Sequence, residues 1–213
     1  MHAIPTKEAL RQALEQRHGK KLQAQFQRAA VAVCGLGGLG SNIAVSLARA
    51  GIGKLILIDF DQVDLSNLHR QQYTVPQIGA FKTDALAETL RNIAPYAEIV
   101  THTVRITEGN MEALLQEADL ICEAFDRAEE KAMLVNGVLE KLPGKYLIAA
   151  SGMAGLFSAN KIKTRRISKY FYLCGDEISD IDNADGLVSS RVMLCAAHQA
   201  HMVLRILAGK AEA

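Results

Sequence analysis

Gly35-Leu36-Gly37-Gly38-Leu39-Gly40-Ser41 is the stretch of this chain that decides its fold. The pattern Gly35-x-Gly37-x-x-Gly40, with Gly38 inside it, follows a short apolar run and precedes a helical pattern. Because glycine has no Cβ, the backbone can turn tightly there and approach a phosphate or a sugar closely. The first N–H groups of the following helix are unpaired and attract an anion. The stretch therefore predicts a nucleotide-binding turn between a strand and a helix.

Short apolar runs alternate with amphipathic helical patterns along most of the chain. We expect strands at residues 31–34, 54–59, 98–103, 120–123 and 146–151, and helices at residues 40–50, 80–93, 111–117, 129–142 and 188–207. This alternation indicates a mostly parallel sheet with helices on both faces. Two further β-like runs between residues 161 and 174 are expected to form an antiparallel addition. The pattern is that of an α/β, Rossmann-like fold.

The chain is expected to divide into an arm and one domain. Residues 6–29 have a helical composition, with Thr6 as a candidate cap and Gly19 as a break. We take residues 1–29 as an N-terminal helical arm and residues 30–213 as a single domain. Residues 176–186 are acidic and poor in large apolar side chains, which predicts a mobile loop there.

The composition argues against several classes of protein. Of the 213 residues 49% are hydrophobic, which is enough to fill one domain. A net charge of +1 gives no global attraction to nucleic acid or to an anionic membrane. No signal peptide is evident, and no apolar run reaches the roughly 18–20 residues of a membrane span. The four cysteines show no CxxC spacing, so we expect no structural zinc and a cytoplasmic location.

Asp59 stands at the end of the second predicted strand, where a carboxylate can accept hydrogen bonds from both hydroxyls of a ribose. Together with the glycine turn alone, this acid fits an NAD(P)-dependent oxidoreductase equally well. However, only about 60 residues follow Ser151, too few for the second catalytic domain that such an enzyme would need. The plainer interpretations are that the glycine turn binds no ligand and that Asp59 merely ends a strand.

A cluster of polar side chains follows Asp59 and favours phosphates. It comprises Asp61, Ser66, Asn67 and Arg70. An arginine can grip phosphate oxygens through its planar fork, and an asparagine amide can hold another oxygen. Lys82 opens the next helix as a point charge that suits an α-phosphate under attack. Either cation alone could be a surface residue, but two beside one crevice suit ATP better than a nicotinamide ring.

Asp126 follows the fourth predicted strand and precedes a helix. A carboxylate on such a loop, facing a triphosphate, is where Mg²⁺ would be held. Asp126-x-x-Glu129 is also a capping box, which is a purely structural signal. We favour the metal role and keep the cap as its alternative.

With these residues in hand, the chain resembles the ThiF/MoeB/HesA family, the bacterial relatives of ubiquitin-activating enzymes. The likeness runs from about Val31 to Ser151 and rests on GLGGLGS, on D-F-D-x-V-D-L-S-N-L-x-R and on the lysine that opens the following helix. The later part, from Phe125 to Asp176, is similar to the short thiamine-type ThiF subfamily. Residues 30–213 would then be one ATP-binding adenylation domain.

The resemblance implies an activity and partners. Such enzymes adenylate the C-terminal Gly-Gly carboxylate of a small ubiquitin-like protein, here a sulfur carrier of thiazole synthesis, and many are homodimers. Gly38 would lie against the nucleotide and Asp59 would take the ribose hydroxyls. Asn67 and Arg70 would hold the β- and γ-phosphates, Lys82 would stabilise the α-phosphate, and Asp126 would bind Mg²⁺. Alternatives are activation of a molybdopterin-type carrier, a tRNA-modifying dehydratase of the same superfamily, and a non-catalytic scaffold.

Four further features of the sequence need an interpretation. Family members often have Asn after the metal-binding Asp, where this chain has Arg127. Arg17 is a candidate for an N-terminal arginine given to a partner subunit's ATP, with an exposed helix residue as the plainer interpretation. Cys174 could accept the activated acyl group or a persulfide, although Asp176 beside it disfavours a thiolate. The pair His198 and His201 is best explained as a partly exposed helix face.

Overall fold

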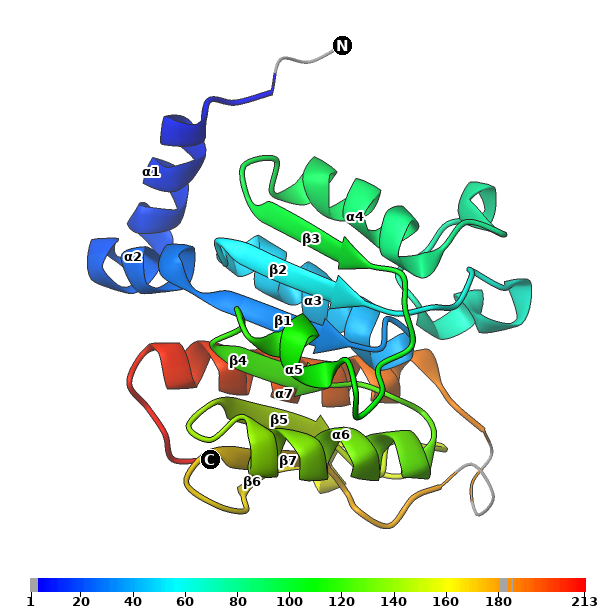
Figure 1. The fold of residues 1–213 in the computed structure, drawn as a ribbon. Helices are drawn as coiled ribbons and strands as arrows, with labels where there is room; N and C mark the ends of the chain where they lie inside the picture. Colours follow the sequence, from blue (N-terminus) through cyan, green and yellow to red (C-terminus); the bar gives the residue numbers. More distant parts are fainter. Residues whose placement is uncertain (1–3, 181–183, 185) are drawn as a thin grey trace.

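The computed structural model describes residues 4–180, 184 and 186–213 (Figure 1). Within this part of the chain, seven strands form one sheet in the order β3-β2-β1-β4-β5-β7-β6. The strands are β1 (Ala30–Cys34), β2 (Lys54–Ile58), β3 (Glu98–His102), β4 (Leu120–Glu123), β5 (Tyr146–Ala150), β6 (Lys163–Arg166) and β7 (Phe171–Gly175). The predicted α/β, Rossmann-like fold is confirmed.

All neighbouring strands run parallel except β6, which pairs antiparallel with β7. The predicted antiparallel addition is therefore confirmed for β6 alone. The second β-like run, β7, continues the parallel sheet, with Leu147 opposite Phe171. Because β1 lies between β2 and β4, the strand order reverses beside β1. Ligands of open α/β sheets bind outside the carboxyl ends of the strands at such a point.

Helices cover both faces of the sheet, as Figure 1 shows. One face carries α3 (Gly38–Ala50), α4 (Lys82–Ile93) and α7 (Ser189–Leu207), and the other carries α5 (Met111–Leu115) and α6 (Ala128–Lys141). Short 3₁₀ helices are η1 (Leu65–Arg70), η2 (Val75–Gln77) and η3 (Ala159–Lys161). The helix boundaries lie within two residues of the predicted ones.

The strands β1, β2, β4 and β5 are mostly apolar because both faces of the sheet are buried there, whereas the edge strand β6 is polar and mostly exposed. Successive residues of β1 point to opposite faces, so Val31 and Val33 pack under α3 and α7, whereas Ala32 and Cys34 pack under α5 and α6. All four are fully buried. The central strand therefore contributes to two cores and is held rigidly, which fixes the turn that follows it.

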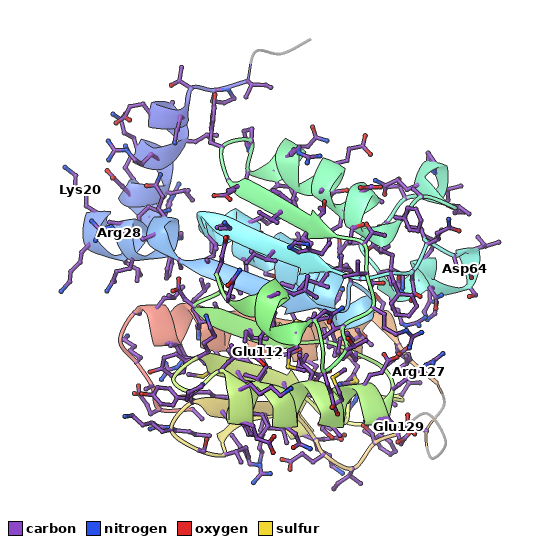
Figure 2. The ribbon with its side chains drawn as sticks, in the orientation of Figure 1. Lys20, Arg28, Asp64, Glu112, Arg127 and Glu129 are labelled. Carbon is purple, nitrogen blue, oxygen red and sulfur yellow. The ribbon has the colours of Figure 1, made fainter. Side chains whose placement is uncertain are left out.

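The N-terminal segment forms α1 (Lys7–His18) and α2 (Lys20–Arg28). The Thr6 side chain accepts a hydrogen bond from the Ala9 N–H at 3.2 Å, and Gly19, with a φ of 86°, separates the two helices. The predicted cap and break are therefore confirmed. Figure 2 shows Lys20 and Arg28 on this arm, at the opposite end of the molecule from Arg127. The division into an arm and a domain stays a prediction.

Two remaining predictions concern segments without regular structure. No helix among the described residues is long and apolar enough to cross a bilayer. The mobile loop predicted for residues 176–186 lies partly outside the described residues, because positions 181–183 and 185 are not among them.

Candidate nucleotide-binding site

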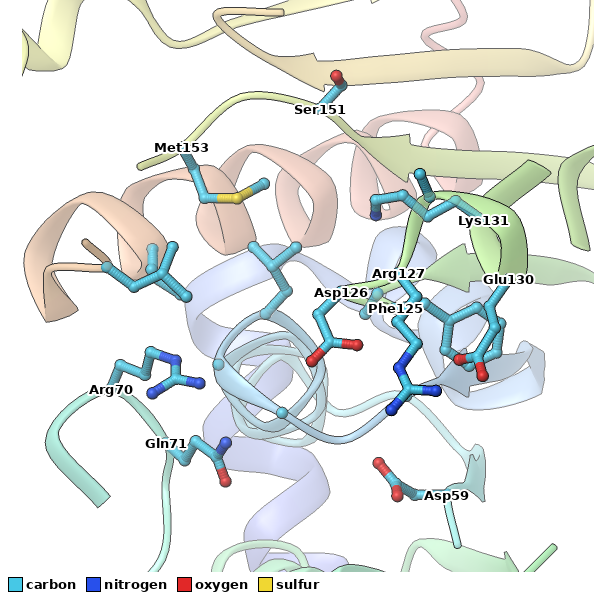
Figure 3. Close-up of a pocket in the computed structure, with 18 of the residues that line it drawn as sticks. Asp59, Arg70, Gln71, Phe125, Asp126, Arg127, Glu130, Lys131, Ser151 and Met153 are labelled. Carbon is cyan, nitrogen blue, oxygen red and sulfur yellow. The ribbon is translucent and has the colours of Figure 1, made fainter. Parts of the chain in front are cut away.

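A cavity of about 430 Å³ opens at the carboxyl ends of β1, β2 and β4 (Figure 3). Nine of the eleven residues predicted to bind nucleotide or metal line it: Gly35, Gly37, Gly38, Asp59, Asp61, Asn67, Arg70, Lys82 and Asp126. These residues come from five separate segments of the chain, so their meeting is a result of the tertiary structure. Gly40 and Ser66 do not line the cavity.

The glycine turn joins β1 to α3, which begins at Gly38, two residues earlier than predicted. Gly35 has a φ of 88°, a conformation that favours glycine. A Cβ on Gly40 would stand only 1.8 Å from the carbonyl oxygen of Gly35. The expectation that Gly40 lines the ligand site is thus corrected: its missing side chain lets the helix pack against the turn.

Asp59 is buried at the end of β2 and is bonded to the glycine turn. Its Oδ2 accepts from the Leu36 N–H at 2.6 Å, and its Oδ1 accepts from the Asp61 N–H at 2.7 Å. Burial raises the pKa of this carboxyl above its usual value, although the Lys82 charge and the two N–H groups act in the opposite direction. The carboxylate is therefore oriented before any ligand binds.

The two residues predicted to bind phosphates, Asn67 and Arg70, both lie on η1, and Arg70 is its last residue. The guanidinium of Arg70 donates to Asn67 Oδ1 at 2.7 Å, so the two side chains form one unit on the cavity wall. The Arg70 carbonyl accepts from Asn42 Nδ2 at 3.3 Å, which ties η1 to α3 near its N-terminus. Ser66 is exposed and does not line the cavity; its backbone N–H donates to Asp64 Oδ1 at 2.8 Å, because Asp64 caps the start of η1.

Lys82 opens α4 as predicted, and its side chain is only 7% exposed. Its Nζ lies 2.8 Å from Asp61 Oδ2, and its backbone N–H also donates to the Asp61 carbonyl at 2.9 Å. A buried ammonium requires such a partner. The Lys82 amine is therefore held in one position at the cavity wall.

Asp126 is exposed in the cavity and faces Arg70 across it (Figure 3). It makes no hydrogen bond or ion pair with any residue that the structure describes. The capping alternative is wrong, because the residue before α6 is Arg127 and no side chain caps that helix. Figure 3 shows the Arg127 guanidinium extending toward Asp59. The Asp126 carboxylate is thus available to a ligand.

Gln71 and Lys131 are among the cavity residues that the sequence analysis missed. Gln71 lines the cavity beside Arg70 with 8% exposure, and Lys131 lines it from α6. Lys131 Nζ bonds both carboxylate oxygens of the buried Glu123, at 2.8 and 2.9 Å. Gln71 could have been proposed from the sequence, because it is a polar residue that directly follows Arg70. No local signal marked the pair of Glu123 and Lys131, because it depends on how α6 packs.

The cysteine and histidine candidates lie outside the cavity. Cys174 is fully buried, and burial raises the pKa of its thiol to about 11, so the expectation of an accessible nucleophile is corrected. His198 is partly buried and pairs with the Thr164 hydroxyl at 2.9 Å. No group of three or more His, Cys, Asp or Glu side chains that could hold a metal ion is found among the described residues.

The sheet order and the cavity define an α/β nucleotide-binding protein of the Rossmann-like class, with cations and carboxylates gathered around the glycine turn. The model of the ThiF family matches residues 10–213, and the chain belongs to this family. The predicted resemblance is confirmed.

Individual relatives cover parts of the chain. The adenylyltransferase and sulfurtransferase MOCS3 of Aedes aegypti is 36% identical over 135 residues, which are 62% of this chain and 31% of that protein. The ubiquitin-like modifier-activating enzyme 5 of Culex quinquefasciatus is 32% identical over 186 residues, 81% of this chain and 46% of that protein. The chain thus spans about a third to a half of the length of these curated relatives.

A solved structure matches the chain almost end to end. The tRNA N6-threonylcarbamoyladenosine dehydratase TcdA of E. coli, in complex with ATP, superposes with a TM-score of 0.85 and covers 98% of both chains at 22% identity. At this identity the likeness establishes the fold.

Proposed function

We propose that this protein binds ATP in the cavity and uses it to adenylate the C-terminal carboxylate of a small ubiquitin-like carrier protein. The observation that carries the proposal is that Arg70, Lys82 and Asp126 line the same cavity as the glycine turn. Two fixed cations beside a helix N-terminus suit a triphosphate. The names of the relatives, an adenylyltransferase and a ubiquitin-like modifier-activating enzyme, support the same activity.

The ribose and phosphates of ATP have matching partners in the cavity. Asp59 is oriented to accept hydrogen bonds from ribose hydroxyls through its remaining lone pairs. The first N–H groups of α3 face the phosphates, and the joined side chains of Asn67 and Arg70 grip their outer oxygens. Lys82 then meets the α-phosphate from the wall formed with Asp61.

The chemistry requires positioning and charge neutralisation, not proton transfer. A C-terminal carboxylate is ionised at pH 7, so it can attack the α-phosphate without a general base. Its oxygen forms a bond to phosphorus while the bond to the bridging oxygen breaks, which releases pyrophosphate and leaves an acyl-adenylate. Arg70 and Lys82 neutralise the negative charge on the phosphate oxygens during this step.

The residues present fit a Mg²⁺ ion bound together with ATP. Asp126 offers an exposed carboxylate that makes no hydrogen bond with a described residue, and phosphate oxygens and water would supply the other ligands that Mg²⁺ prefers. When bound, the ion would shield the charge of the phosphates. The protein need not contribute a larger acidic cluster for this purpose.

For the partner we propose a ThiS-like sulfur carrier with a C-terminal Gly-Gly, in thiamine thiazole synthesis. Its support is the similarity of residues 125–176 to the short thiamine-type subfamily. The names of the relatives, an adenylyltransferase and sulfurtransferase and a ubiquitin-like modifier-activating enzyme, do not specify a thiamine carrier. The acceptor must therefore be identified by experiment.

We further propose a homodimer. The segment from η1 to the start of α4 exposes several large apolar side chains: Leu65 is 69% exposed, Val75 67%, Phe81 42% and Ile78 41%, as expected of a surface that a second copy covers. Arg17 lies on α1, at the end of the sheet away from its own cavity (Figure 1), so any contact that it makes with ATP would be in a partner's site.

The proposal is tested by exchange of labelled pyrophosphate into ATP. We expect exchange with a purified ThiS-like carrier and none when the two terminal glycines are removed. The same exchange is measured in parallel with molybdopterin-type carriers. Exchange with none of these carriers contradicts the activity, and exchange with the molybdopterin type alone changes the partner. Tight binding of NAD without binding of ATP would favour the oxidoreductase instead.

A further inference from the structure

The cavity has a second wall that holds none of the proposed partners of ATP. Two loops form this second wall, residues 151–154 after β5 and residues 177–180 after β7. The proposed partners of ATP lie instead after β1, β2 and β4, on η1 and at the start of α4. Figure 3 shows Ser151 and Met153 on the side of the cavity opposite Asp59. The second wall therefore faces the space that a group reacting with the nucleotide would enter.

The two loops of the second wall are bonded to each other along their backbones. The Asp176 N–H donates to the Gly152 carbonyl at 2.9 Å, and the Glu177 N–H donates to the Ser151 carbonyl at 3.0 Å. A Cβ on Gly152 would stand only 2.1 Å from Asp176 Oδ1, so the loops could not approach this closely with a side chain there. The two loops thus form one packed unit.

Glu177, in the second of these loops, has a strained backbone. Its φ is 61°, and it is the one non-glycine residue in the described part of the chain with a positive φ. A residue stays in this conformation only where the surrounding contacts impose it, and such residues gather at functional sites. Because Glu177 itself lines the cavity, the contacts that hold its loop deserve a functional explanation.

A buried ion pair between Arg191 and Asp176 holds the second wall from behind. The two side chains are 4% and 5% exposed. The Arg191 guanidinium also donates to the carbonyls of Phe157 and Ser158, the latter at 2.9 Å, and so reaches the chain that follows the first loop. Arg191 lies in the first turn of α7, where the helix dipole disfavours a cation. Its tertiary contacts therefore account for its position.

The second loop also folds around the Asp176 carboxylate. Oδ1 accepts from the N–H groups of Ile178 and Ser179 at 3.0 and 2.8 Å, while Oδ2 pairs with Arg191. Neither Asp176 nor Arg191 lines the cavity. The pair can therefore affect a ligand only through the loops that it holds in place.

We propose that Asp176 and Arg191 are positioning residues for the acceptor, because their ion pair fixes the second wall against which the acceptor's C-terminal tail binds. The identity of the acceptor as a carrier protein rests on the proposed function. Ser151, Gly152 and Ala154 are small, so an extended tail can approach the backbone of the wall. A wall that is already ordered loses little entropy when the tail binds, which strengthens the binding.

The test separates acceptor binding from ATP binding. We expect Arg191→Met to raise the KM for the carrier in pyrophosphate exchange about tenfold, while the Kd for ATP, measured by calorimetry, stays within about twofold of wild type. Arg191→Lys should recover part of the loss, since its ammonium can still pair with Asp176. The matched control is Arg165→Met, which removes an exposed cation paired with Glu177 and should leave both constants within about twofold of wild type.

Hydrogen exchange measures the order of the second wall without any carrier. In Arg191→Met the amides of residues 176–179 should exchange at least about tenfold faster, while the amides of β1 keep their wild-type rates. Melting curves establish that the variant is folded. If it is not, Asp176→Asn, which keeps the shape of the side chain and removes its charge, takes its place in both measurements.

A wild-type KM for the carrier in the folded variant overturns the proposal, and so does an equal loss of affinity for ATP. A lower Tm with both constants unchanged shows a merely structural pair and also overturns it. Failure of the proposed function is recognised separately, because the wild-type protein itself would then show no exchange with any carrier, and the role in acceptor binding would fall with it. A raised KM together with faster exchange in the loop supports the proposal.

Discussion

Lys82 and Asp61 are joined twice, once through their side chains at 2.8 Å and once through the backbone at 2.9 Å. The bond between the backbones places the start of α4 against the segment after β2. The bond between the side chains then holds the amine at the cavity wall. An ammonium that is already oriented loses little entropy when a phosphate arrives, which is the property that electrostatic catalysis requires.

Lys82→Ala should reduce carrier-dependent exchange of pyrophosphate by about 10²–10³, because a fixed charge contact in a transition state contributes roughly 3–4 kcal/mol. Asp61→Asn should reduce it less than about tenfold, since an asparagine oxygen still accepts from Lys82. Lys20→Ala, on the arm at the other end of the molecule (Figure 2), is the control for loss of a positive charge. Exchange at the wild-type level in Lys82→Ala would remove Lys82 from the mechanism.

Asp126→Asn should raise the Mg²⁺ concentration needed for half-maximal exchange by about tenfold or more, because a carboxylate is replaced by a neutral ligand. Its free energy of unfolding should stay within about 0.5 kcal/mol of wild type, since Asp126 bonds to no described residue. Glu129→Gln is the matched control, because Glu129 lies nearby in the first turn of α6 but does not line the cavity. A Mg²⁺ titration equal to that of wild type contradicts the metal role.

Lys131→Met should destabilise the fold by about 3 kcal/mol in chemical denaturation, because it leaves the buried carboxylate of Glu123 without its ion-pair partner. Glu123 Oε1 also accepts from the Phe125 N–H at 2.7 Å, next to Asp126, so the variant should weaken Mg²⁺-dependent ATP binding as well. The double variant with Glu123→Gln should recover part of the stability, since no buried charge remains. Strictly additive losses would show that the two residues do not act as a pair.

The four cysteines should be unreactive in the folded protein. All are fully buried, and burial raises the pKa of Cys174 to about 11. A thiol reagent at pH 8 should therefore modify none of them until guanidinium unfolds the chain. Rapid modification of Cys174 in the folded protein would restore it as a candidate nucleophile.

The raised thiol pKa also has a consequence for stability. The unfolded chain releases the Cys174 proton near pH 9.0, whereas the folded protein releases it near pH 11. The free energy of unfolding should therefore fall between these pH values, because only the unfolded state gains from ionisation. Cys174→Ala should lessen this fall, measured by denaturation at a series of pH values. An unchanged slope would contradict the assignment to Cys174.

Local patterns were sufficient for the elements. They also named nine residues that the tertiary structure brings to one cavity, whose binding roles stay predictions. Alternating apolar runs placed β1 to β5 between helices, and Thr6 and Gly19 marked the first helix because caps and breaks act within a few residues. The glycine turn and its strand-end acid were recognisable for the same reason. Gly40 and Ser66 were misassigned because their neighbours in sequence, Gly35 and Asp64, engage them structurally.

The order of residues by itself determined which segments become strands and helices, and which chemical groups stand at the ends of those strands. Only the tertiary structure decided that Gln71 Oε1 is buried without a hydrogen bond, that Lys131 pairs with Glu123, and that Cys174 is buried in the core. The physical reason is the distance along the chain over which each effect acts. Turns, caps and periodicity are properties of a few adjacent residues, whereas burial and pairing depend on which distant surfaces pack together, and that choice is made by the whole chain at once.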